Sequence, residues 1–162
     1  LRGNLETRLK KLETEGLDAI ILAAAGLIRL GWDDRITEII SPEVLLPAMG
    51  QGAVGIETRK NDVDNQILLA DMDDEETHYA LDAERALVSE LEGGCNVPIG
   101  SYATINGDQI TLTGLVASLD GKTMYKKELS DLKTNAIALG RKVGGELIDM
   151  GADRIMRDIQ SH

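Results

Sequence analysis

The sequence predicts both α/β and α+β structure: an α/β layer comes first, and a small domain follows in which a three-stranded antiparallel sheet packs on helices. Near the start, a helical pattern over 5–15 is followed by a short apolar run over 18–24 and a further helical turn or two over 25–30. This order is typical of an α/β layer. Further along, residues 98–129 divide into three strand-like segments separated by turn signals, which is typical of an antiparallel meander.

The first helix is predicted from its ends and its leucines. Asn4 is suited to cap it, Gly16 is suited to end it, and the leucines between them recur at helical spacing. The apolar run over 18–24 is of the kind that forms a strand buried on both faces of a sheet. We therefore expect helix, buried strand and helix in succession.

Between residues 36 and 72 the pattern changes several times. The isoleucines over 36–40 predict another short helix, which Pro42 would stop before a loop. A glycine-rich loop then turns into a segment of strand character over 53–57, and residues 61–72 predict a helix.

An acidic stretch over 71–76 precedes the next helix, which is predicted over 77–91. Carboxylates at a helix N-terminus interact favourably with the helix dipole, so this stretch is interpreted as a solvated cap rather than a metal site. Two glycines, Gly93 and Gly94, end the helix abruptly, and Cys95 follows in a tight loop before Pro98.

The rest of the chain supplies the antiparallel domain. Tight-turn residues at 106–108 and 120–121 separate its strands. The predicted elements are strands over 98–105, 109–118 and 122–129, a helix over 134–150 ended by Gly151, and a short helix to residue 160.

Composition limits the class of protein. The chain has 162 residues, 43% of them hydrophobic, a net charge of -11, 2% aromatic residues and no Phe. Few aromatics and an acidic total disfavour nucleic acid as a partner. No apolar run approaches the roughly 20 residues that cross a bilayer, so we expect a soluble, cytoplasmic protein. The chain begins with Leu1 rather than Met, which indicates a truncated or split protein.

Three sets of residues could carry chemistry. Gly50, Gly52 and Gly55 spell G-x-G-x-x-G, but a dinucleotide site needs a strand before this motif and a helix after it. A loop precedes it here and a strand-like segment follows, so we favour a hinge or a close backbone crossing. Arg2, Arg8 and Arg29 lie at the edges of elements, where they either bind carboxylates or are simply solvated.

Cys95 is the one cysteine of the chain. A buried structural role is the commonest for a lone cysteine, although a glycine- and proline-flanked loop suits it poorly. A nucleophile would need a histidine base, and neither His78 nor His162 is well placed. One cysteine also supplies a zinc site poorly, so we expect no metal. A covalent attachment point is the third possibility.

Four motifs in this order resemble the porphobilinogen deaminase family. They extend from residue 1 to near the end of the chain, and their ordered occurrence makes the resemblance specific. The motifs are LRGN at 1–4 with TRL at 7–9, DAIILAAAGL at 18–27 with RL at 29–30, LPAMGQGAVGIE at 46–57, and ER at 84–85 followed by LEGGCNVPIG at 91–100.

The resemblance implies a transferase of porphyrin, and hence heme, biosynthesis, hydroxymethylbilane synthase. Such an enzyme condenses four porphobilinogen molecules head to tail into hydroxymethylbilane and releases ammonia each time. The growing chain is primed by a dipyrromethane cofactor held through a thioether, here on Cys95. Arg2, Arg8 and Arg29 fall on positions that bind the carboxylates of cofactor and substrate, and Gly26 and Gln51 fall on positions that line the cleft.

The resemblance also implies two lobes like those of binding proteins, present only in part. Residues 1–48 would complete domain 2, 49–72 would cross back to domain 1, and 73–162 would form domain 3 with the cofactor cysteine. The catalytic aspartate would lie in an N-terminal half that this chain lacks. We therefore expect no turnover without that half, which another chain could supply. The alternatives are a noncatalytic anion-binding protein and a stand-alone interaction domain.

Overall fold

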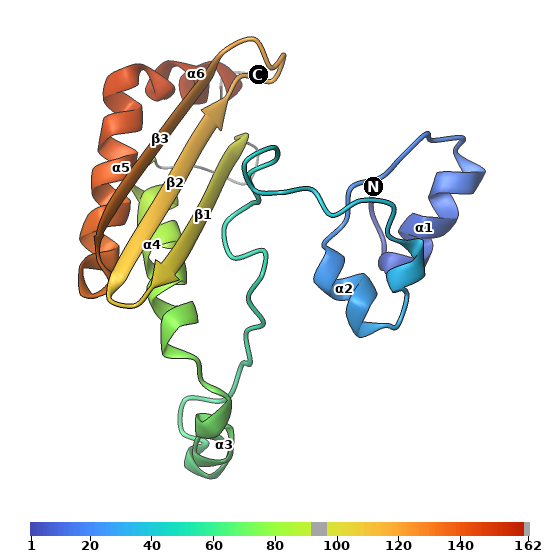
Figure 1. Ribbon diagram of the computed structural model, residues 1–162, viewed down its shortest axis with the longest axis horizontal. Coiled ribbons are helices and arrows are strands. Elements are labelled where there is room, and N and C mark those ends of the chain that lie inside the picture. Colours follow the sequence, from blue (N-terminus) through green and yellow to red (C-terminus); the bar gives the residue numbers. More distant parts are fainter. Residues whose placement is uncertain (92–96, 161–162) are drawn as a thin grey trace. The chain divides into compact units, whose positions relative to one another are not determined.

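The computed structural model describes residues 1–91 and 97–160. The chain divides into two compact units, residues 1–41 and residues 42–162. Figure 1 shows the course of the chain by colour and labels its helices and strands.

The first unit holds the helices α1 (Leu5–Thr14) and α2 (Ala24–Arg29) and a 3₁₀ turn η1 (Asp33–Arg35). The predicted cap is confirmed, since the amide of Thr7 donates to Oδ1 of Asn4 over 2.8 Å. Gly16 follows α1 with a φ of +63°, as expected for a residue that ends a helix. Of residues 1–41, only Leu27 is buried, with 6% of its surface exposed.

Two predictions for this unit are wrong. Residues 18–23 form no strand, and α2 begins at Ala24. A strand needs a hydrogen-bonded neighbour, and residues 1–41 contain no second strand for it to pair with. The helix predicted over 36–40 is also absent, and Ile39 there is 70% exposed, so little packing is available to stabilise so short a helix.

The second unit begins with a long irregular segment and then becomes regular. The strand predicted over 53–57 is wrong for the same reason as the first, since these residues pair with no neighbouring strand of the described chain. Helix formation downstream is confirmed. Residues 61–72 contain α3 (Val63–Leu69) and the 3₁₀ turn η2 (Ala70–Met72), and α4 covers Glu75–Glu90.

The acidic stretch caps α4, as predicted. The amide of Thr77 donates to Oδ1 of Asp74 over 2.7 Å, and Glu75 and Glu76 lie in the first turn of the helix. The end predicted at Gly93 and Gly94, and Cys95 after it, lie outside the described residues.

The antiparallel meander is confirmed, in the order β1-β2-β3. The strands are β1 (Ile99–Asn106), β2 (Gln109–Ala117) and β3 (Met124–Leu132). Gly107 and Gly121 adopt positive φ values of +61° and +69° in the two connections. The register sets Tyr102 opposite Thr113, and Thr113 in turn opposite Glu128.

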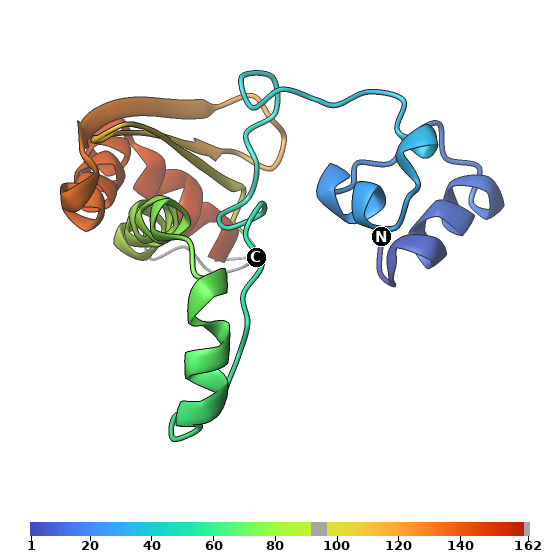
Figure 2. The same ribbon diagram turned by 60° about the horizontal axis from the view of Figure 1, so that its bottom comes forward.

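The helices α4, α5 (Ala136–Met150) and α6 (Ala152–Gln160) cover one face of this sheet, as Figure 2 shows. A 3₁₀ turn, η3 (Lys133–Asn135), leads into α5. The core lies between sheet and helices, where Leu87, Leu112 and Leu147 are fully buried. Each such side chain contributes about 1.5–3 kcal/mol by leaving water, so this layer holds the domain together.

Candidate functional site

Arg8 is held at the start of α1 by the backbone that precedes the helix. Its Nε donates to the carbonyl oxygen of Gly3 over 2.8 Å. Gly3 itself has a φ of +117°, and a Cβ there would lie 2.7 Å from Cγ2 of Thr7. The turn therefore requires glycine, and it fixes the base of the Arg8 side chain while the rest of the guanidinium fork can still donate.

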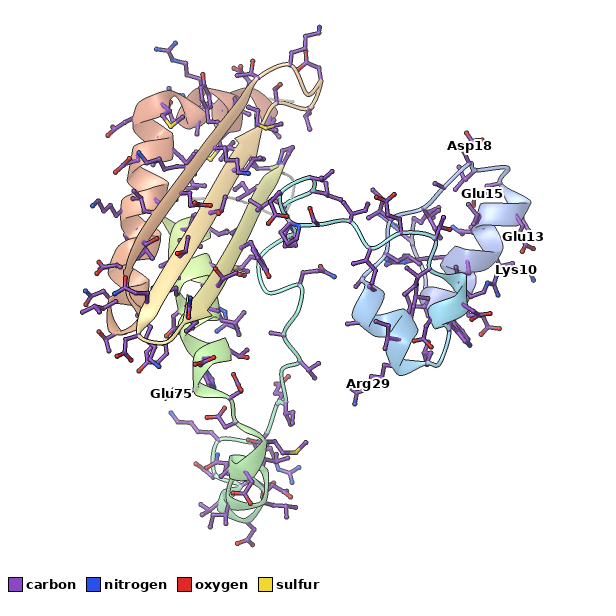
Figure 3. All side chains as sticks on the ribbon, in the orientation of Figure 1. Lys10, Glu13, Glu15, Asp18, Arg29 and Glu75 are labelled. Atoms are coloured by element: carbon purple, nitrogen blue, oxygen red, sulfur yellow. The ribbon has the colours of Figure 1, made fainter. Side chains whose placement is uncertain are left out.

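Arg2 and Arg29 are exposed, and neither makes a hydrogen bond or ion pair within the described chain. Arg2 directly precedes the Gly3 turn to which Arg8 is bonded. Arg29 ends α2, and Figure 3 shows its side chain projecting outward from that helix end. The structure thus brings Arg2 and Arg8 to the start of α1, while Arg29 lies at the end of α2.

Gly26 lies where the two helices of the first unit approach each other. A Cβ at this position would lie 2.9 Å from Cδ1 of Leu5, on α1. That spacing is closer than a real Cβ contact, so a larger residue would require the end of the Leu5 side chain to move. Gly26 therefore lies in direct contact with Leu5 of α1.

Gln51 is exposed in the turn that starts the glycine-rich segment. Its amide donates to the carbonyl of Ala48 over 3.2 Å, and the neighbouring Gly50 has a φ of +69°. A Cβ on Gly50 would lie 3.3 Å from Leu81, whereas Gly52 and Gly55 have open space around them. Of the three glycines in the G-x-G-x-x-G pattern, only Gly50 is thus required by its conformation.

Glu84 is a residue of this region to which the sequence patterns assigned no role. It lies on α4 and is only 7% exposed. One carboxylate oxygen, Oε2, accepts from the amide of Gly50 over 2.8 Å, and Oε1 accepts from the amide of Ala103 over 2.9 Å. A signal was available, because Glu84 recurs one helical turn after Ala80 and one before Leu87, on the apolar face of the helix.

Burial raises the pKa of Glu84, and the hydrogen bonds from Gly50 and Ala103 oppose that rise only in part. Two backbone amides pointing at one carboxylate is the arrangement expected for a buried anion. Both carboxylate oxygens of Glu84 thus accept from backbone amides, and the side chain holds the chain at Gly50 and Ala103.

A cleft of about 840 Å³ lies between residues 49–58 and the helices α3 and α4. His78 and Asp73 at its edge are paired over 2.6 Å, and this pair raises the pKa of His78. Arg85 also lines the cleft, but Arg2, Arg8 and Arg29 do not. The cleft belongs to residues 42–162, whereas Arg2, Arg8 and Arg29 belong to residues 1–41.

The described ranges 1–91 and 97–160 contain no cluster of three His, Cys, Asp or Glu side chains able to hold a metal ion. Within the same ranges, every helix is too short or too polar to cross a membrane. Cys95 lies outside them, in the connection between α4 and β1.

Family models match both parts of this architecture. Residues 1–67 match the family model described as "Porphobilinogen deaminase, dipyromethane cofactor binding domain". Residues 79–149, which include the sheet and most of α4 and α5, match "Porphobilinogen deaminase, C-terminal domain". Both matches point to one class of cofactor-binding deaminases. The chain belongs to the porphobilinogen deaminase family.

Three individual relatives agree, and each of them is named porphobilinogen deaminase. The protein from Syntrophobacter fumaroxidans is 50% identical over 159 residues, covering 98% of this chain and 52% of its own length. That from an Exiguobacterium species is 46% identical over 160 residues, with the same coverage. That from Ruthia magnifica is 49% identical over 158 residues, again covering 98% and 52%. The chain thus spans about half the length of these relatives.

Proposed function

We propose that this chain is the C-terminal part of a porphobilinogen deaminase, the transferase also called hydroxymethylbilane synthase. It would join four porphobilinogen molecules head to tail into hydroxymethylbilane, with release of ammonia at each addition. The observation that supports this most is the ordered match of both family models, over residues 1–67 and 79–149. Relatives at 46–50% identity with that name support it further.

The cofactor assignment rests on the family and on the chain's one thiol. Residues 1–67 match a domain described as binding dipyrromethane. Cys95 is the chain's single cysteine, so a thioether to the cofactor would form there. The bound dipyrromethane supplies the primer pyrrole that is extended. A covalent primer keeps the growing end at the site, which raises its effective concentration for every addition.

Arg2, Arg8 and Arg29 would bind the acetate and propionate groups of cofactor and substrate. The donor chemistry fits, because each pyrrole brings two carboxylates and guanidinium forks pair with carboxylates in bidentate fashion. The side chains of Arg2 and Arg29 have no hydrogen-bond or ion-pair partner within the described chain, and Arg8 donates to Gly3 only through Nε. These forks are therefore available to an anionic ligand.

Gly26 and Gln51 would line the cleft that holds the growing tetrapyrrole. Gly26 supports this by letting α1 and α2 approach, since a Cβ would contact Leu5 at 2.9 Å. Gln51 supports it because it is exposed. It lies on a turn that is fixed by the hydrogen bond from the Gly50 amide to Glu84. An exposed amide can donate to a ligand carboxylate or accept from a pyrrole N–H.

The wider arrangement follows from the coverage of the relatives. Residues 1–48 would belong to domain 2 and 49–72 would return to domain 1, which together make the two-lobed part of the enzyme. Residues 73–162 would form domain 3. The catalytic aspartate would lie in the N-terminal half, which the relatives contain in addition to the part matched here. Residues 1–162 would then turn over no porphobilinogen alone, and the assembled enzyme would work in the cytoplasm.

The cofactor linkage is tested by intact mass measurement on the complete protein, with the N-terminal half joined to residues 1–162. We expect a mass increase equal to one dipyrromethane and a colour reaction with Ehrlich's reagent. The variant Cys95→Ser should lose both, because it removes the chain's one thiol.

The matched control is Ser89→Ala, a similarly small change at an exposed position of α4, which should keep the adduct. An unmodified Cys95 that reacts fully with iodoacetamide in the complete protein would contradict the assignment. That result would instead favour a noncatalytic anion-binding protein.

A further inference from the structure

The irregular segment before α3 is attached to the sheet at one edge. β1 pairs with β2, and within the described chain no strand pairs with its other edge. The amide of Ser101 on that edge donates to the carbonyl of Pro47 over 3.0 Å. Two residues further along β1, the amide of Ala103 donates to Glu84. The outward amides of Ser101 and Ala103 are therefore both occupied.

The contact at this edge is close. A Cβ at Gly100 would lie 3.1 Å from Cβ of Leu46 and 3.3 Å from its carbonyl oxygen. Gly100 itself is buried. A glycine at this point of β1 lets the backbone of the segment approach the strand directly. Leu46 and Pro47 thus lie directly against β1 at Gly100 and Ser101.

Glu84 joins three elements through one carboxylate. It is carried by α4, which packs against β1 (Figure 1), and it receives one amide from the segment and one from the strand. Within the described chain it forms no ion pair, so the two amides are its partners. A carboxylate can accept both bonds at once, whereas a neutral amide side chain can accept only one of them through its single oxygen.

We propose that Glu84 is a positioning residue, which fixes the turn bearing Gln51 against the domain that carries the Cys95 loop. This inference rests on the function proposed above. Gly50, which Glu84 holds, is the residue directly before Gln51. Ala103, which it also holds, lies on the strand that follows the cysteine loop. The carboxylate fixes the turn at Gly50 relative to β1 at Ala103 without touching substrate.

The two hydrogen bonds that Glu84 accepts from Gly50 and Ala103, here called the clamp, are measured first by amide hydrogen exchange on residues 1–162. This measurement does not need activity. In the unsubstituted chain we expect the Gly50 amide to exchange at least about tenfold more slowly than the Gly52 amide. In Glu84→Gln the amide of Gly50 or of Ala103 should exchange about ten- to a hundredfold faster, as expected when a hydrogen bond to a charged group is lost. The amide of Leu112, in the middle of β2, should not change.

Glu76→Gln is the matched control, since Glu76 is exposed on the first turn of the same helix. Should Glu84→Gln not fold, Glu84→Asp keeps the charge on a shorter side chain and should release one of the two amides. Equal exchange of Gly50 and Gly52 in the unsubstituted chain would overturn the clamp. So would unchanged exchange at both Gly50 and Ala103 in either folded variant.

The consequence for Gln51 is measured by a double-mutant cycle in the complete enzyme. Glu84→Gln and Gln51→Ala should each raise the KM for porphobilinogen, by about three- to tenfold, and the double variant should be no worse than the worse single one. Additive effects on KM would overturn the positioning role, even with a clamp visible by exchange. A complete, cofactor-loaded protein with no turnover would instead sink the proposed function, and the exchange result would be unaffected.

Discussion

Asp74 and Glu84 lie ten residues apart on or next to the same helix, and their pKa values shift in opposite directions. The backbone amide of Thr77, followed by its side chain, lowers the pKa of the exposed Asp74. Burial raises the pKa of Glu84. Asp74 therefore contributes stability at neutral pH that is lost as the pH falls through its lowered pKa. Glu84 has the reverse sign, because its stability contribution falls as the pH rises through its raised pKa.

His78 offers a direct test of side-chain electrostatics. The hydrogen bond that His78 Nε2 donates to Asp73, and then the charge of Asp73, raise the pKa of His78 above the usual value. This pair adds stability that is fully present below about pH 6.5 and is lost as the pH rises through the raised pKa. We expect the titration of its ring protons by NMR to show a pKa above the usual value, and Asp73→Asn to lower it.

Asp71→Asn is the control for this titration. Asp71 belongs to the same exposed acidic stretch but does not contribute to the shift of His78. His78→Gln assigns the resonance, since the chain has two histidines. If both Asn variants shifted the titration equally, general charge rather than the Asp73 contact would be the cause.

Among the elements, local pairing decided which predictions succeeded. Each strand of the meander is within a short turn of its partner, so alternation and turn residues were enough to predict β1, β2 and β3 within a few residues. The strands predicted over 18–24 and 53–57 have β-like sequences but no neighbour within the described chain. A β-like sequence shows that a segment is suited to a sheet, but it forms a strand only where a neighbouring strand pairs with it.

Glycines govern how closely α5 packs on α4. A Cβ at Gly140 would lie 2.3 Å from the carbonyl oxygen of Ala83, and one at Gly144 would lie 2.7 Å from Cβ of Glu90. Gly145, the next residue on α5, has no atom within 4 Å of a Cβ position. Close packing on α4 therefore requires glycine at positions 140 and 144, but not at position 145.

This contrast predicts opposite effects of the same substitution. Gly140→Ala should lower the free energy of unfolding by about 1–3 kcal/mol, because the methyl group displaces α4. Gly145→Ala should raise it by about 0.5–1 kcal/mol, since alanine is the better helix former. Urea denaturation followed by circular dichroism measures both. Equal effects of the two substitutions would show that α4 and α5 are not packed this closely.

At the scale of the whole molecule, several large apolar side chains between residues 54 and 68 are exposed. Val54 is 77% exposed, Ile67 is 69% exposed and Leu68 is 74% exposed, all between the glycine-rich segment and α4. The first unit buries one side chain, whereas the second has a continuous core. Such exposure is typical of surfaces that another part of a protein covers.

The proposed N-terminal half predicts how activity is distributed. Residues 1–162 alone should give no hydroxymethylbilane, because the relatives are about twice as long and the chain spans 52% of their length. Adding the separately produced half should restore turnover, measured as porphobilinogen consumed. Turnover by residues 1–162 alone would contradict this. So would a mixture that assembles, carries the cofactor and remains inactive.

The candidate site was predictable in its residue types but not in its support. Arginines in ordered motifs pointed to carboxylate binding, and their assigned positions stay a prediction. The position of Glu84 on the apolar face of α4 indicated burial, but the sequence did not show which groups its carboxylate would contact. Only the positions of Gly50 and Ala103, which lie 34 and 19 residues away in sequence, give it a purpose.

The occupied edge of β1 also affects whether the protein can aggregate by pairing strands with another molecule. An edge strand with unused amides is a template on which a strand of another molecule can grow. Here Ser101 and Ala103 have already given their hydrogens to Pro47 and Glu84. A strand from another molecule would have to displace Pro47 of this protein and approach the charge of Glu84. At Ser101 and Ala103 the edge of β1 is therefore closed to an added strand.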